Sequence, residues 1–189
     1  MPSKTEREAA MDTLNKIETD TPRVWLACMA CYNEGKPTGE WIDAADAETV
    51  APEDLHDGPT THEELWAYDV ENMLHNYEMD AHEAVKQAQL LAAVDPYERD
   101  AFRAWADSGA EITDTEGLPD LEAFRESYQG EWASFREFSD DYINNSGLLD
   151  GIGQEITRYF DFDLYASELK HDYTVVWPDT DTAYVFLNI

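Results

Sequence analysis

The chain has 189 residues, 43% hydrophobic and 12% aromatic, and its 42 Asp and Glu against 12 Lys and Arg give a formal charge of -30 at pH 7. This content of apolar side chains excludes intrinsic disorder, because a chain of this length can bury them in a core. The charge excludes attraction to nucleic acid or acidic membranes and favours a basic partner.

The first residues are expected to add little to the fold. Residues 1–20 have mixed charge and few apolar side chains, which is typical of a frayed helix or a disordered arm. The sequence shows neither the apolar core of a secretory signal peptide nor an apolar stretch long enough to span a bilayer. We therefore expect a cytoplasmic protein.

Three strand-like segments follow. Residues 23–30 are apolar and rich in strand formers, and residues 39–43 follow them after a turn. A loop with two Pro and an Asp-Gly pair, residues 51–61, leads to a third candidate at 65–70. The pattern predicts a small antiparallel sheet, which forms a first domain over residues 21–79.

The composition then changes to that of helices. Residues 81–91 have high helix propensity, and Asp80 stands where an N-cap is favoured. Phe102 and Trp105 share the inner face of a second predicted helix. We predict an all-helical middle domain over residues 80–126.

The last part of the chain mixes both periodicities. Aromatic and aliphatic residues recur at spacings of three, four or seven, which predicts helices interrupted near Gly130 with this stripe in the core. The stripe consists of Leu121, Phe124, Tyr128, Trp132, Phe135 and Tyr142. A helix at 162–169 and strands at 174–177 and 183–187 predict a second sheet. The expected fold class is α+β, with a C-terminal α/β domain over residues 127–189.

A CxxC motif is the most distinctive short pattern. Cys28 and Cys31 have no second cysteine pair, so a zinc site would need His or carboxylate ligands from elsewhere in the chain. Because Cys28 falls within a predicted strand, we interpret both thiols as small packing residues, with a redox or metal role as the less favoured alternative. The five histidines form no HExxH motif and are interpreted as surface or half-buried side chains.

Other catalytic signatures are missing from the sequence. It contains no P-loop, no GxSxG and no complete dinucleotide-binding glycine pattern. With 42 carboxylates, pairs of acids arise by chance and say little about acid–base catalysis. We therefore predict a protein that is not an enzyme and needs neither a metal nor a cofactor.

The acidic residues are concentrated in two stretches. Residues 38–85 hold fourteen carboxylates and no Lys or Arg, and residues 107–150 hold twelve against two Arg. Glu122 and Glu126 are spaced i,i+4 in a predicted helix, where like charges cost a few tenths of a kcal/mol. Repeated small costs of this kind indicate that the acidic surface is selected for something other than stability.

Several blocks of the sequence resemble one family. The segment RVWLACMACYNEG at residues 23–35, followed by GEWIDA at 39–44, resembles the opening of the ArdA antirestriction proteins. The resemblance continues in family order with ELWAYD at 64–69, YQGE at 128–131 with Ser134, and YFDFD at 159–163. Residues 1–20 extend beyond the usual start, and Cys31 stands where a small residue such as Ala is more usual.

The resemblance implies a mimic of B-form DNA that is carried on mobile genetic elements. Such a protein occupies the DNA-binding groove of type I restriction–modification enzymes, and it contacts neither nucleic acid nor membranes. The family fold is elongated, with three small α/β or helical domains, and it forms a homodimer through its C-terminal domain. For this chain the implied fold has antiparallel sheets at both ends of a helical middle domain.

The carboxylates expected to face the partner come from the acidic stretches. Only three of them, Glu64, Asp69 and Glu131, lie within the matching blocks, since the family spreads its acids over a surface. Asp43, Asp161 and Asp163 also lie in these blocks but are not included. The predicted set is Glu63, Glu64, Asp69, Glu71, Glu78, Asp80, Glu83, Asp107, Glu111, Asp114, Glu116, Asp120, Glu122, Glu126, Glu131, Glu137, Asp140 and Asp141.

Charge density makes mimicry physically reasonable. Duplex DNA carries one charge per about 1.7 Å, so thirty charges correspond to roughly 50 Å, or about 15 base pairs. A compact chain of this length has a radius of gyration of about 16 Å and is too round to present such a line of charge. Mimicry therefore predicts an elongated molecule. Two alternatives stay open: an acidic halophilic enzyme or metal-binding domain whose charge is solvent adaptation, and a mimic aimed at another DNA-binding protein.

Overall fold

The computed structural model describes residue 16 and residues 19–189. The chain divides into two compact units, Met1–Arg99 and Asp100–Ile189, each with one three-stranded antiparallel sheet and several helices. This confirms the predicted mixture of helices and strands with two small antiparallel sheets, whereas the three-domain division is not confirmed. The predicted N-terminal arm lies almost wholly outside the described residues. Within those residues, no helix combines the length and apolarity needed to cross a membrane.

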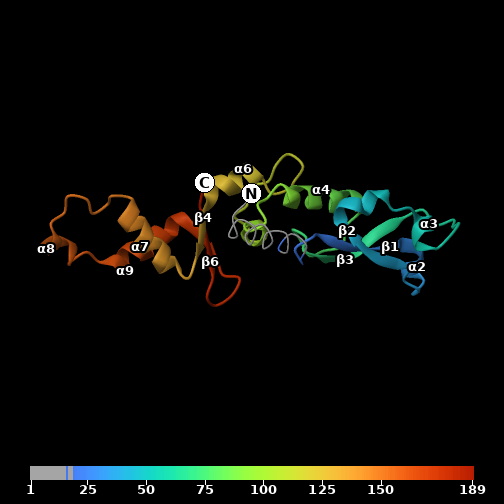
Figure 1. The fold of residues 1–189 in the computed structure, drawn as a ribbon, viewed down its shortest axis with the longest axis horizontal. Helices are drawn as coiled ribbons and strands as arrows, with labels where there is room; N and C mark the ends of the chain where they lie inside the picture. Colours follow the sequence, from blue (N-terminus) through green and yellow to red (C-terminus); the bar gives the residue numbers. More distant parts are fainter. Residues whose placement is uncertain (1–15, 17–18) are drawn as a thin grey trace, which may run out of the picture. The chain divides into compact units, whose positions relative to one another are not determined.

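The first unit contains the predicted first sheet (Figure 1). Its elements are β1 (Arg23–Cys28), α2 (Met29–Asn33), β2 (Gly39–Asp43), η1 (Ala44–Thr49), α3 (Pro52–Leu55), β3 (Leu65–Glu71) and α4 (Ala81–Ala92). The strand order is β2-β1-β3, and both pairings are antiparallel. The first strand ends at Cys28 rather than near residue 30, because α2 begins at Met29 and places the CxxC motif at a strand–helix junction.

The core of the first unit lies between the sheet, η1 and α4. Val24 and Leu26 on β1 are completely buried, and each such side chain contributes about 1.5–3 kcal/mol. Ala84 and Ala88 on one face of α4 pack into the same cluster, so α4 shares a core with the sheet. Asp80 caps this helix as predicted, because its side chain accepts a hydrogen bond from the Glu83 amide.

The second unit contains the other sheet (Figure 1). Its elements are α5 (Arg99–Ala106), which begins at the boundary, α6 (Leu121–Ser127), β4 (Tyr128–Trp132), α7 (Phe135–Asn145), α8 (Gln154–Thr157), α9 (Phe162–Leu169), η2 (Lys170–Asp172), β5 (Tyr173–Val176) and β6 (Ala183–Leu187). The order β4-β6-β5 confirms the predicted strands at the chain's end and makes β6 central. Its residues 183–186 are accordingly buried.

Aromatic side chains form much of the second core. Phe102, Trp105 and Phe124 pack together with ring centroids 5.0–6.2 Å apart, which confirms the predicted inner face of α5. The predicted helical stripe is wrong at Tyr128 and Trp132, which belong to β4. The chain leaves α6 after Ser127, bends at Gly130 (φ 105°) and pairs with β6. Tyr142 is 39% exposed, so the stripe does not continue into the core there.

Candidate acidic partner-binding surface

The negative charge of the protein lies at its surface. Among the described residues Asp20 is the only buried acid, and its carboxylate lies 3.3 Å from the guanidinium of the buried Arg99. The described part of the first unit holds 18 carboxylates against five Lys and Arg, and the second unit holds 20 against five. Both units are therefore strongly anionic.

Every predicted partner-binding carboxylate is at least partly accessible. Fourteen of the eighteen are exposed and none is buried. The half-buried ones are Glu83, Glu111, Asp120 and Asp140. In the first unit the members of the set lie on or next to β3 and at the start of α4. In the second unit they lie from the end of α5 into α7. The structure thus makes the whole set available without selecting among its members.

Some of these carboxylates are fixed in place by backbone amides. Asp120 accepts hydrogen bonds from Glu122 N at 2.8 Å and Ala123 N at 2.9 Å, which caps α6. Asp114 accepts from Glu116 N and Leu118 N in the preceding turn. These bonds leave the negative charge in place and reduce the freedom of the side chain that carries it.

Other carboxylates of the set have side-chain partners. The Nε–H of Arg136 donates a bifurcated hydrogen bond to the two carboxylate oxygens of Asp140, at 2.9 and 3.0 Å, and this contact is the main reason why the pKa of Arg136 is raised. Glu83 accepts a 2.6 Å hydrogen bond from Tyr77. Partial burial and then this bond raise the pKa of Tyr77 to about 12. These acids contribute to local structure as well as to charge.

A third group faces solvent without such partners. Glu122, Glu126, Glu131 and Asp141 are exposed, and their side chains form neither ion pairs nor hydrogen bonds within the part of the chain that the structure describes. Glu122 and Glu126 both lie on α6, whose opposite positions Ala123, Phe124 and Ser127 are buried. These four carboxylates are therefore free to meet basic groups of a partner.

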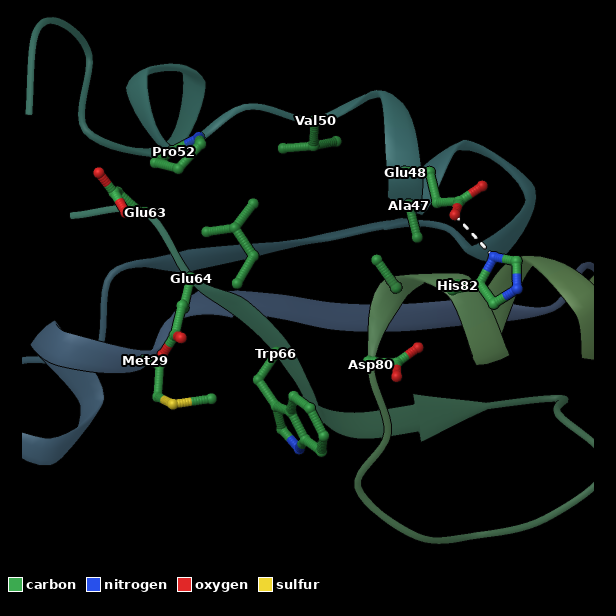
Figure 2. Close-up of a pocket in the computed structure, with 12 residues that line it drawn as sticks. Met29, Ala47, Glu48, Val50, Pro52, Glu63, Glu64, Trp66, Asp80 and His82 are labelled. Carbon is green, nitrogen blue, oxygen red and sulfur yellow. Dashed lines mark hydrogen bonds and ion pairs between the residues drawn. The ribbon is translucent and has the colours of Figure 1, made fainter.

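A groove of about 530 Å³ adds a recess to the acidic surface of the first unit. Figure 2 shows Val50 and Pro52 on one side and Trp66 and Asp80 on the other. The other acidic residues that line the groove are Glu48, Glu63 and Glu64. The Oε1 atom of Glu48 lies 2.8 Å from Nδ1 of His82. Carboxylates beside apolar walls suit the aliphatic stem and charged head of Lys or Arg. Glu48 lies outside the predicted set of carboxylates, because no local sequence pattern distinguishes it.

The CxxC motif also has an unexpected environment. Cys28 and Cys31 are free thiols and are buried, which agrees with their predicted packing. The half-buried side chains of His56 and His62 meet them, however, and the four potential ligand atoms lie within 4.8 Å of one another. The two thiols and two imidazoles are therefore close enough to bind one metal ion, although both thiols are also packed in the core.

The comparison with known families gives one match, and no curated protein matches the chain. The sequence model of the antirestriction protein family ArdA matches residues 24–185, which include every described strand from β2 to β5, all of β1 except Arg23, and the first three residues of β6. ArdA proteins are inhibitors rather than enzymes. Because the match covers most of the chain, the protein belongs to the ArdA family of antirestriction proteins, whose partners are restriction–modification enzymes.

Proposed function

We propose that this protein inhibits type I restriction–modification enzymes by taking the place of B-form DNA in their DNA-binding groove. The observation that carries the proposal is the placement of the charge: within the described residues all acids except Asp20 are accessible to a partner. Each unit carries exposed acids of its own, so the charge offered to a partner is not confined to a single acidic tail. Family membership supports the class of target.

The proposed mechanism is competition by charge. Carboxylates occupy positions that phosphates take in the natural complex, where they contact the Lys and Arg that hold the DNA backbone. Sequence-specific contacts are bypassed, since most of the affinity of such grooves comes from the backbone charges. Release of counterions makes the complex weaken as salt rises. The carboxylate-lined groove of Figure 2 fits this scheme as a place for one basic side chain.

Homodimer formation is part of the proposal. Ile156 and Tyr159 in the second unit are 67% and 79% exposed and line one surface recess together with Ile152, and large apolar side chains gathered at a surface favour association. We expect the protein to sediment as a dimer, and we expect Ile156→Asp combined with Tyr159→Asp to give monomers. A wild-type protein that is monomeric at micromolar concentration would remove this part of the proposal.

Displacement of DNA tests the function directly. Labelled DNA bound to a type I methyltransferase is titrated with the protein at about 0.1 M and 0.5 M salt, beside a compact acidic protein of equal net charge. We expect displacement near stoichiometric amounts at low salt, weaker displacement at high salt and none by the control. Displacement equal to that of the control would assign the acidity to solvent adaptation. Displacement of DNA from an unrelated repressor or nuclease, but not from this enzyme, would indicate another target.

A further inference from the structure

Four side chains at the end of β1, the central strand of the first sheet, form a compact group of sulfur and nitrogen atoms. Cys28 is the last residue of β1 and Cys31 lies one turn later in α2, with exposed fractions of 0% and 9%. His56 follows the C-terminal end of α3, and His62 lies in the segment that leads into β3. Three separate stretches of chain therefore converge at this point.

The distances within the group match those between ligands of one tetrahedral metal ion. His62 Nδ1 lies 3.2 Å from Cys28 Sγ and 3.4 Å from Cys31 Sγ, and His56 Nε2 lies 3.8 Å from Cys31 Sγ. A tetrahedron with Zn–S bonds of about 2.3 Å and Zn–N bonds of about 2.0–2.1 Å places its ligand atoms about 3.3–3.8 Å apart. The observed values fall in or next to this range.

The orientation of the imidazoles agrees with the same geometry. The ring centroids of His56 and His62 lie 5.2 Å apart, and the ring planes meet at 78°. Two imidazoles bound to one tetrahedral zinc have centroids about 5.2 Å apart, because each centroid lies about 3.2 Å from the metal. The backbone turns between them at Asp57 (φ 53°) and Gly58 (φ 151°), which brings both rings to the same site.

The sequence spacing also corresponds to a zinc-binding pattern. Two residues separate the cysteines and five separate the histidines, as in sites of the form Cys-x2-Cys and His-x3–5-His. Two sulfur and two nitrogen ligands in a tetrahedron favour zinc among the common metals. The alternative for a CxxC pair, a reversible disulfide, does not account for two histidine nitrogens that approach the thiols from another part of the chain.

We propose that Cys28, Cys31, His56 and His62 bind one Zn²⁺ as a closed structural site. Binding converts both thiols to thiolates and releases two protons, while the histidines bind as neutral imidazoles. The dipositive ion and two thiolates cancel, so the net charge of the protein does not change. The site joins the end of β1 and α2 to the segment that carries Glu63 and Glu64, and it holds that segment against the sheet. This role does not depend on the proposed inhibition of restriction enzymes.

The decisive experiment uses the full-length protein with Co²⁺ and Zn²⁺ as probes. An excess of Mg²⁺ is included to occupy surface carboxylates, which bind hard cations, whereas thiolates do not. We expect one equivalent of Co²⁺ to give the strong visible bands of tetrahedral cobalt and a thiolate charge-transfer band, and Zn²⁺ to abolish both. Hydrogen exchange across residues 56–64 is expected to slow when Zn²⁺ binds.

Variants locate the ligands. Cys31→Ser and His56→Gln each remove one ligand, and we expect zinc affinity to fall by more than about 100-fold, because loss of an outer hydrogen-bond partner alone costs about 10- to 100-fold. The matched control is His82→Gln, which removes an exposed histidine that is paired with Glu48 and should leave affinity unchanged. The wild-type cobalt spectrum remains informative even if a variant fails to fold.

Three results would overturn the proposal. The first is a cobalt complex without thiolate bands, which would place the metal on carboxylates. The second is zinc affinity that is the same in Cys31→Ser, His56→Gln and the wild type. The third is a Cys28–Cys31 disulfide that forms in the presence of stoichiometric Zn²⁺, because a zinc-bound thiolate pair resists oxidation.

Discussion

Removal of four unpaired carboxylates gives the sharpest test of which charges bind the partner. The variant carries Gln in place of Glu and Asn in place of Asp at Glu122, Glu126, Glu131 and Asp141. Each exposed ion pair with a partner contributes about 0.2–1 kcal/mol, so the loss of four is expected to cost about 1–4 kcal/mol of binding energy. This corresponds to roughly a 5- to 1000-fold rise in Kd for the restriction–modification enzyme.

The effect on folding has the opposite sign. Glu122 and Glu126 repel each other at i,i+4 on α6, so their neutralisation should stabilise the protein by a few tenths of a kcal/mol. None of the four side chains caps a helix or pairs with a described cation. A variant that binds more weakly and unfolds no more easily cannot owe its loss of binding to unfolding.

A matched variant controls for net charge. It removes the same four charges within the second unit at exposed acids outside the predicted set: Glu155, Glu168, Asp172 and Asp181. Competition titrations at fixed ionic strength compare both variants with the wild type, and urea unfolding measures their stability. Equal losses of affinity in the two variants would refute the assignment of a specific face and leave only a dependence on total charge.

Two further predictions concern the ion pair and the tyrosine described above. Arg99→Met should lower the free energy of unfolding in urea by about 3–5 kcal/mol, because the buried carboxylate of Asp20 then loses its ion pair with Arg99. Asp20→Asn in the same chain should restore part of this loss, and an equal or larger loss in the double variant would contradict the reasoning. Tyr77 has a pKa of about 12 in the folded protein, against about 10 when unfolded. Its contribution to stability is therefore present below pH 10 and lost between about pH 10 and 12, so Tyr77→Phe should flatten the fall in stability over this range.

The sheets could be predicted because their strands carry local signals. In β1 the residues Val24 and Leu26 alternate with more exposed ones, and β6 is a short apolar run next to a turn. The cap of α4 was equally local, since Asp80 precedes a run of strong helix formers. These features depend on neighbours within a few residues, and the sequence alone contains them.

The fourth strand could not be predicted from spacing. Phe124, Tyr128 and Trp132 are four residues apart, and a spacing of four fits one face of a helix. The same spacing is even, so in a strand it also places Tyr128 and Trp132 on one face. Only the pairing with β6, more than fifty residues later, decides between the two. For α4 the sequence likewise predicts a helix but not the sheet core on which it packs.

The His–Cys group was missed for a related reason. His56 and His62 lie 25 and 31 residues after Cys31, so no short sequence motif joins them to the CxxC pair. The available signal was the spacing of the histidines to each other. Two pairs of potential ligands at zinc-like spacing are worth testing together, even when a long segment separates them.

The use of the few cations shows how the chain tolerates so many acids. Arg23 lies within 3.9 Å of Asp43 and 3.8 Å of Glu71, which belong to the two strands on either side of β1. Arg136 on α7 contacts both Asp140 and Asp163, and so links this helix to α9. Each of these arginines joins segments that its acidic neighbours would otherwise drive apart. Other described carboxylates cap helices, contact neighbouring side chains, as Glu83 contacts Tyr77, or face solvent. Stability and partner binding therefore draw in part on different acids. For this reason we expect the unpaired acids of α6, β4 and α7 to be replaceable without loss of the fold, whereas replacement of Arg99, whose ion pair with Asp20 is buried, should destabilise it more than replacement of the exposed Arg23 or Arg136.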